Sequence, residues 1–265
     1  MVDPMEAVDQ IAFLARSKAR VHVLEQLRDH GPATQRDLRD RLDASRSTVT
    51  RSLTALEDRG WIERDDRSYR LSPKGEVVTD EFLSLRDSVR AVDELSPFLQ
   101  WFPYAEFPLD LSALREADIT SAASPDPYAP ARKQTELIET EDSFRGFLPS
   151  LDIEGTRVVH EQIVNGGFEA EVVVPESVER TIASGEYAEL FGEQLATGRL
   201  TVFVLDDDVP FYLGLAGDTV QIGVEDDEGF PRALLETTAE SIREWATDVY
   251  ESHRERSRVK PADDF

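Results

Sequence analysis

The apolar positions between residues 34 and 72 change their spacing twice, and this segment gives the clearest structural prediction in the chain. Val49, Leu53 and Leu56 follow one another at i, i+4 and i+7, which places them on one buried face of a helix. Ser45 comes just before this run, where a serine hydroxyl can accept a hydrogen bond from a free backbone amide. The pattern therefore predicts an amphipathic helix that starts after Ser45.

Two shorter helical patterns precede this helix. Thr34 can cap a helix whose apolar pair, Leu38 and Leu42, is spaced to pack against the helix that follows Ser45. The segment from Arg20 to Leu27 supplies a further helix with its apolar residues on one side. Together the three segments predict a small helical core.

A hairpin is predicted directly after the helices. Gly60 fits a C-terminal helix stop, and the segments 61–64 and 68–71 alternate between apolar and polar residues on either side of Asp65-Asp66-Arg67. Helices followed by a two-stranded hairpin are the order of a winged helix-turn-helix. In this arrangement the helix after Ser45 is the recognition helix and the hairpin is the wing.

Hydroxyl and guanidinium groups gather on the polar face of the predicted recognition helix and on the wing. The front of the helix carries the positive end of its dipole, and there the candidate DNA contacts are Ser45, Arg46, Ser47, Thr48, Thr50 and Arg51. On the wing, the candidate phosphate contacts are Arg64, Arg67 and Arg70. The alternatives are a winged helix that binds protein and arginines that are solvated surface charges or ion-pair partners.

The pattern next predicts a long helix that leads into a second domain. Lys74 to about Leu95 forms an amphipathic segment, either a connecting and dimerising helix or one that packs on the winged helix alone, and a proline- and aromatic-rich stretch then interrupts it. We expect a DNA-binding domain at 1–75, a connecting helix at 76–100 and an effector domain at 101–265.

The second domain is predicted to be mixed α/β. Strands are expected at 117–123, 145–151, 168–174, 200–205, 211–215 and 220–224. Helices are expected at 156–165, 176–183, 186–196 and 234–253. Leu235 and Trp245 are assigned to the apolar face of the last helix.

Charge is distributed unevenly along the chain. The whole sequence has 29 Lys/Arg, 54 Asp/Glu and a formal net charge of −25, which would repel DNA. Residues 1–75 hold 14 Lys/Arg and 13 Asp/Glu, so the excess acid lies in the rest of the chain. Only 4 of the basic residues are lysine, and this acid-rich, lysine-poor balance resembles proteins of halophilic archaea. In their molar salt the Debye length is about 3 Å, so the acidic half would barely repel DNA.

Length and composition set further limits. The 265 residues, of which 40% are hydrophobic, suit two domains that each bury a core. Because there is no cysteine, disulfides, thiolate metal ligands and a cysteine nucleophile are excluded. The sequence contains neither a signal peptide nor a spanning run of about 20 apolar residues, so we expect a cytoplasmic protein that does not enter the membrane.

Several short motifs resemble those of known regulators. In the first half they are Phe13-Leu14-Ala15-Arg16-Ser17, Ser45-Arg46-Ser47-Thr48-Val49, Arg59-Gly60-Trp61 and Leu71-Ser72-Pro73-Lys74-Gly75. This set is similar to the DNA-binding domain of haloarchaeal winged-helix regulators. The later motifs are Trp101-Phe102-Pro103, Ala117-Asp118-Ile119-Thr120, Asp126-Pro127-Tyr128-Ala129-Pro130 and Ile242-Arg243-Glu244-Trp245-Ala246. They resemble the effector half of that group, the methanogenesis-regulator (FilR-type) domain.

The resemblance implies a one-component transcription regulator whose effector domain has a phospholipase-D-like fold without its catalytic residues. The H-x-K-x4-D motif of that superfamily is absent, since His160 is followed by Glu161-Gln162. No nucleophile elbow, phosphate-binding glycine loop or metal-spaced histidine pair occurs, so we expect no enzyme activity, no cofactor and no metal. The acidic runs at 206–208 and 225–228 fit solvated loops better than a cation site.

The sequence thus predicts a transcription regulator that binds double-stranded promoter DNA as a homodimer and whose C-terminal domain senses a small molecule or a partner. The sequence marks no effector-binding residue. A winged helix that contacts the transcription machinery is one alternative, and a phosphodiesterase-like enzyme is a more distant one.

Overall fold

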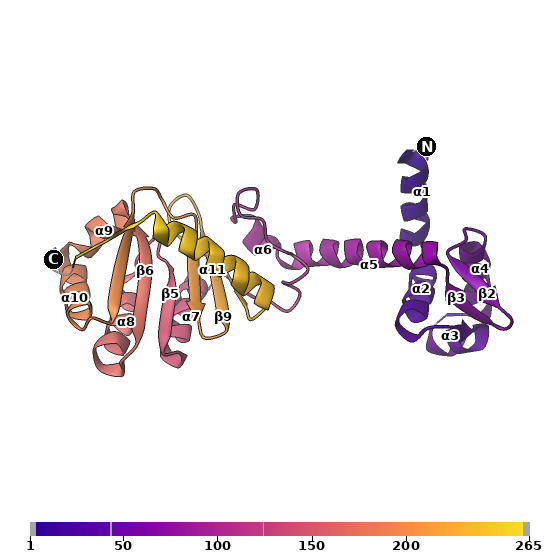
Figure 1. Ribbon diagram of the computed structural model, residues 1–265, viewed down its shortest axis with the longest axis horizontal. Helices are drawn as coiled ribbons and strands as arrows, with labels where there is room; N and C mark the ends of the chain where they lie inside the picture. Colours follow the sequence, from indigo (N-terminus) through magenta and orange to yellow (C-terminus); the bar gives the residue numbers. More distant parts are fainter. Residues whose placement is uncertain (1–3, 43, 124, 262–265) are drawn as a thin grey trace. The chain divides into compact units, whose positions relative to one another are not determined.

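The computed structural model describes residues 4–42, 44–123 and 125–261, and the chain divides into two compact units, Met1–Val89 and Arg90–Phe265. The long helix α5 (Pro73–Glu94) crosses the boundary between the units (Figure 1). Each unit has its own hydrophobic core.

The first unit combines short helices with a small antiparallel sheet. Its helices are α1 (Pro4–Ala15), α2 (Lys18–His30), α3 (Gln35–Arg41) and α4 (Arg46–Glu57). Its strands are β1 (Ala33–Thr34), β2 (Ile62–Asp65) and β3 (Ser68–Leu71), in the order β1-β3-β2. The predicted winged helix-turn-helix is confirmed, with α3 as the support helix, α4 as the recognition helix and β2–β3 as the wing.

The helix caps expected from the sequence are present. The Ser45 hydroxyl accepts a hydrogen bond from the backbone amide of Thr48 at 3.2 Å. Thr34 and Asp37 form a reciprocal capping box at the start of α3, and their hydrogen bonds hold the pKa of the Asp37 carboxyl below its usual range. The apolar face of α4 is buried, as predicted, through Val49, Leu53 and Leu56.

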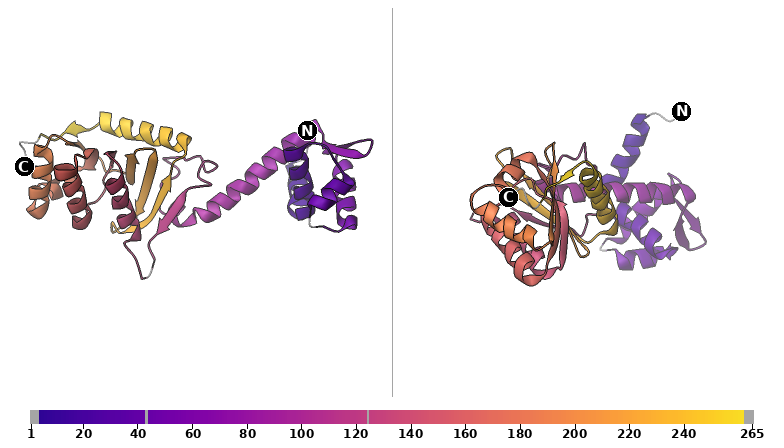
Figure 2. Two further views of the ribbon diagram at one scale, coloured as in Figure 1. Left: turned by 90° about the horizontal axis from the view of Figure 1, so that it is seen from below. Right: turned by 60° about the vertical axis from the view of Figure 1, so that its left-hand side comes forward.

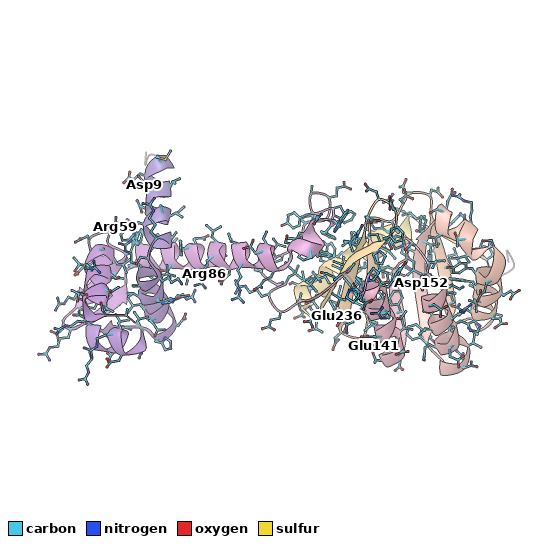
Figure 3. The ribbon with its side chains drawn as sticks, turned by 180° about the vertical axis from the view of Figure 1, so that it is seen from behind. Asp9, Arg59, Arg86, Glu141, Asp152 and Glu236 are labelled. Carbon is cyan, nitrogen blue, oxygen red and sulfur yellow. The ribbon has the colours of Figure 1, made fainter. Side chains whose placement is uncertain are left out.

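The start of α5 packs tightly against the backbone of Trp61, the residue just before β2. The Ser72 backbone amide donates to the Trp61 carbonyl at 3.0 Å, and a Cβ placed on Gly75 would lie 1.7 Å from that same carbonyl oxygen. Only glycine therefore allows α5 to pack this closely. Further along, the Arg86 side chain (Figure 3) forms an ion pair with Glu25 of α2.

The second unit is built on one mixed β-sheet. Its strands are β4 (Asp118–Ser121), β5 (Ser143–Phe147), β6 (Glu169–Pro175), β7 (Leu200–Leu205), β8 (Tyr212–Ala216), β9 (Thr219–Glu225), β10 (Pro231–Thr237) and β11 (Arg258–Val259). Their order is β11-β7-β6-β5-β8-β9-β10-β4, with β5, β6 and β7 parallel and the other pairs antiparallel.

Helices cover both faces of this sheet, as Figures 1 and 2 show. One face carries α6 (Ser96–Leu99) and α11 (Glu240–Glu255). The other carries α7 (Ala129–Thr140), α8 (Ile153–Glu161) with a π-helical turn (Gln162–Gly166), α9 (Glu176–Ile182) and α10 (Gly185–Ala196). Successive residues of a strand pack into the cores on opposite faces of the sheet. Val173 faces the α11 side, whereas Val172 and Val174 face the α8 side. The mixed α/β class predicted for this domain is confirmed.

Some elements differ from the sequence prediction. The expected helix at 234–253 is wrong at its start, because Leu234 and Leu235 belong to β10 and lie buried on opposite faces of the sheet. A leucine pair fits a helix or a central strand equally well by its pattern alone, and pairing of β10 with both β9 and β4 decides between them. The helices α1 and α7 were not predicted, and the strand expected at 145–151 spans Ser143–Phe147.

We predict that Gly75→Ala destabilises the protein because its new methyl group would overlap the Trp61 carbonyl. Overpacking of this kind costs about 1 to 3 kcal/mol. Gly192→Ala is the matched control, since Gly192 is also helical and has no neighbouring atom within 4 Å of the added Cβ. Alanine should stabilise that helix by about 0.5 to 1 kcal/mol. Calorimetry measures the midpoint temperature of unfolding for both variants. Equal midpoints for Gly75→Ala and Gly192→Ala would contradict the prediction.

Candidate nucleic-acid interface

Most of the predicted contacts on the recognition helix lie together in the structure. One shallow surface hollow at the start of α4 is lined by Ser45, Arg46, Ser47, Thr50 and Arg51. These side chains are exposed, whereas Thr48 is half-buried beside them. The amphipathic pattern of α4 produces this grouping, because the residues that alternate with the buried stripe must face solvent.

Two of the hydroxyl groups already have structural roles. The Ser45 hydroxyl caps α4 and lies 2.9 Å from the Thr48 hydroxyl. The Thr50 hydroxyl donates to the Arg46 carbonyl at 2.8 Å, and it accepts a hydrogen bond from the Gln35 side-chain amide at 2.6 Å. These groups therefore hold the front of α4 in shape and tie it to α3.

Gln35 is a residue of this surface that the sequence prediction missed. It is the first residue of α3, directly after the Thr34 cap, and its amide bridges to Thr50 across the turn between the two helices. The cap at Thr34 is the signal that locates it, because the residue after a cap stands at the end of a helix dipole.

The two arginines of the hollow have no acidic partner within the described ranges. Neither Arg46 nor Arg51 makes an ion pair or a side-chain hydrogen bond with any residue of 4–42, 44–123 or 125–261. Their guanidinium groups, each with donors in a planar fork, are thus available for phosphate oxygens or for the acceptor atoms of guanine.

The three predicted arginines of the wing differ in whether their side chains already have a partner. All are exposed, but the Arg70 guanidinium binds the Glu63 carboxylate at 2.7 Å, and Arg64 Nε donates to the Asp66 carbonyl at 3.1 Å. Arg67 makes no such contact with the described part of the chain, and it follows Asp66, which has a left-handed φ of 53°. The turn therefore places Arg67 at the tip of the wing as its available cation.

Among the described residues, no group of three or more His, Asp or Glu side chains is arranged to hold a metal ion. None of the helices described is long and apolar enough to cross a membrane.

The fold and this surface define a winged helix-turn-helix protein with a mixed α/β second domain. Comparison with known families agrees with that class. Residues 8–94 match the HVO_A0261 N-terminal domain, and residues 127–256 match the middle domain of the methanogenesis regulatory protein FilR1. The chain therefore combines a region that matches the HVO_A0261 N-terminal domain with one that matches the FilR1 middle domain, and this is a regulator-like architecture.

Several solved structures are similar in fold. TrmBL2, an archaeal chromatin protein whose structure shows a mode of DNA binding, is 10% identical over 94% of this chain and 98% of its own, with a TM-score of 0.43. Nuc, a phospholipase D family member from Salmonella typhimurium, is 13% identical over 54% of this chain and 98% of its own, with a TM-score of 0.42. The transcriptional regulator Tm0710 from Thermotoga maritima is 23% identical over 34% of this chain and 79% of its own, with a TM-score of 0.26. No curated protein matches the chain.

We predict that Ser45→Ala lowers the free energy of unfolding by about 1 kcal/mol, because α4 loses its N-terminal cap. Ser47→Ala is the matched control on the same helix, since the Ser47 hydroxyl lies 3.0 Å from the Ser45 hydroxyl but accepts no backbone amide of the described residues. Denaturant titration of the two variants measures the difference. A loss as large for Ser47→Ala as for Ser45→Ala would show that the cap is not the cause.

Proposed function

We propose that the protein is a one-component transcription regulator that binds promoter DNA in a sequence-specific manner through α4 and the wing. The observation that carries the proposal is the pair of guanidinium groups, Arg46 and Arg51, that have no partner among the described residues and lie on the exposed front of a recognition helix. In a winged helix-turn-helix this end of the helix enters the major groove.

The electrostatics of the first half support this role. Segment 44–56 contains no Asp or Glu, so no acid of α4 itself faces the arginines at its front. The positive end of the helix dipole adds to their charge. Arg67 at the wing tip can bind phosphate and so fix the position of α4 along the duplex, a contact that carries little sequence information.

The second unit is proposed to sense an effector and to carry out no catalytic step. His160, the histidine nearest to a catalytic pattern, lies 2.7 Å from the Glu193 carboxylate and has no lysine two positions further along. This contact joins α8 to α10 and gives His160 a structural role.

The long helix α5 supports a homodimer. Phe82, Leu85, Val89 and Val92 follow one another with the 3-4-3 spacing of a coiled-coil seam. Phe82 packs against the core of the first unit, whereas Leu85, Val89 and Val92 are exposed by 51%, 56% and 42%. A second copy of the same helix would cover this apolar stripe. Two copies would then present two recognition helices to a palindromic site.

Regulation would follow from a population shift. If a small molecule or partner binds one arrangement of the dimer more tightly, the spacing of the two recognition helices changes, and half-sites about one helical turn apart are matched or missed. The effector must differ in affinity between the two arrangements, because equal affinity shifts no equilibrium.

We predict that Arg46→Ala and Arg51→Ala each weaken binding to duplexes selected from a random pool by the wild-type protein. Loss of a base contact should cost about 1 to 3 kcal/mol, roughly a 5- to 150-fold rise in Kd, and relax the preference at one base pair. Arg180→Ala removes the same charge from an exposed helix of the second unit and is the control. Wild-type affinity in both α4 variants at unchanged fold would favour a protein-binding winged helix instead.

We also predict that Val89→Glu shifts the protein from dimer to monomer, because it buries a carboxylate in the α5 seam without a partner. Ser84→Glu adds the same charge to an exposed position of α5 away from the seam and should leave the dimer intact. Sedimentation equilibrium in molar KCl measures both masses. The dimer proposal fails if the wild type is monomeric or if Val89→Glu remains dimeric.

A further inference from the structure

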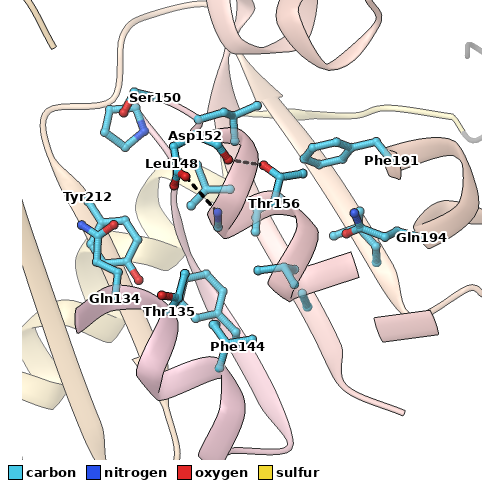
Figure 4. A pocket seen from close by; sticks show the side chains of 18 of the residues that line it. Gln134, Thr135, Phe144, Leu148, Ser150, Asp152, Thr156, Phe191, Gln194 and Tyr212 are labelled. Atoms are coloured by element: carbon cyan, nitrogen blue, oxygen red, sulfur yellow. Dashed lines mark hydrogen bonds between the residues drawn. The ribbon is translucent and has the colours of Figure 1, made fainter. Parts of the chain in front are cut away.

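The second unit contains a cavity that lies between its sheet and the helices α7, α8 and α10 (Figure 4). Its volume is about 110 Å³. Most of its wall is apolar and comes from Ile138, Phe144, Phe168, Val172 and Phe191. Cavities of this order, about 150 Å³ in a well-known case, hold one six-membered ring. The space therefore suits a molecule with a small, compact apolar body.

A buried amide in the wall lacks a hydrogen-bond partner. Gln194 of α10 is only 1% exposed, and its side-chain nitrogen has no partner among the described residues. An unsatisfied buried donor costs about 1 to 3 kcal/mol, so a folded protein seldom keeps one without compensation. An oxygen atom on a bound molecule would provide that compensation.

The neighbouring polar groups are already engaged. The Thr156 hydroxyl donates to the Asp152 carbonyl at 2.7 Å, as Figure 4 shows. The Tyr212 hydroxyl lies 3.3 Å from the Gln221 side-chain oxygen, and burial raises the pKa of this phenol well above its usual range. Both hydroxyl groups thus have a partner, whereas the fully buried Gln194 amide keeps a free donor among the described residues.

The charged groups that line the cavity disfavour anionic ligands. Of the described lining residues, Asp152 and Glu225 are acidic and none is Lys, Arg or His. The Ser150 hydroxyl donates to Glu225 at 2.5 Å, and burial raises the pKa of that carboxyl. An anion would meet two carboxylates and no counter-charge, so carboxylates and phosphates are disfavoured.

We infer that this cavity is the effector site and that it takes a small, neutral, mainly apolar molecule whose oxygen accepts a hydrogen bond from Gln194. The inference rests on the proposed sensing role of the second unit, and it adds the place and the chemistry of the ligand. Apolar burial supplies most of the affinity, and the Gln194 amide supplies the selectivity for an oxygen-bearing ligand.

The test uses phenol, toluene and benzoate as probes of the full-length protein in molar KCl. Methyl chemical shifts of Ile138 and Val159, which line the cavity, report binding by NMR titration. We expect phenol to bind, toluene to bind more weakly by about fivefold to tenfold, and benzoate not to bind. Shifts with benzoate alone, or with none of the three probes, would overturn the inference.

Variants separate the role of Gln194 from a purely structural one. Gln194→Leu should weaken phenol by about fivefold to tenfold, leave toluene unchanged and keep or raise the melting temperature, because it removes an unsatisfied amide. Gln100→Leu, at an exposed glutamine of the same unit, is the matched control and should bind phenol as the wild type does. Ala170→Leu should fill the cavity and abolish binding of both neutral probes. Equal phenol affinity in the wild type and Gln194→Leu contradicts the assignment.

The outcome also separates this inference from the proposed function. Probe binding is measured without DNA, and affinity for a selected duplex is measured without a probe. If the probes bind as expected but no duplex is selected, the DNA-binding proposal fails and the cavity assignment stands. If a duplex binds but no probe does, the cavity assignment fails alone.

Discussion

Burial of one face of α4 is the constraint on which the rest of the first unit depends. Val49, Leu53 and Leu56 lie in its core, so the residues that alternate with them are forced outward. Because the Ser45 cap also fixes where the helix begins, Arg46 and Arg51 can only emerge at its exposed front. A change in the register of this buried stripe would turn both guanidinium groups toward the core.

In so acidic a protein, the lack of a partner for Arg46 and Arg51 among the described residues is unusual. In the second unit, arginines commonly meet carboxylates, as Arg157 does with Glu186 and Arg258 with Glu179. The wing shows the same tendency in the Arg70–Glu63 pair. Exposed pairs such as Arg70–Glu63 add little stability, but they occupy the donors that a phosphate would need. The absence of acid from segment 44–56 keeps the front of α4 outside this pattern.

In the second unit, burial of apolar side chains forms a cavity rather than an exposed charged surface. Its sheet is covered on both faces, and where α7, α8 and α10 meet the sheet the side chains leave a cavity lined largely by rings and aliphatic groups. A protein with a net charge of −25 thus contains a cavity suited to a neutral molecule. Surface charge and ligand charge need not match, because most of the cavity wall is apolar.

The sequence by itself determined the elements whose signals are local. Caps at Thr34 and Ser45, the apolar stripe of α4 and the hairpin residues around Asp66 specify the winged helix-turn-helix, since each acts within a few residues. Only the tertiary structure decided that Leu234 and Leu235 form a strand, that Gln35 meets Thr50, and that Gln194 faces a cavity. These facts depend on partners far along the chain, such as β4 for β10, and no local pattern records which distant residue will supply the contact.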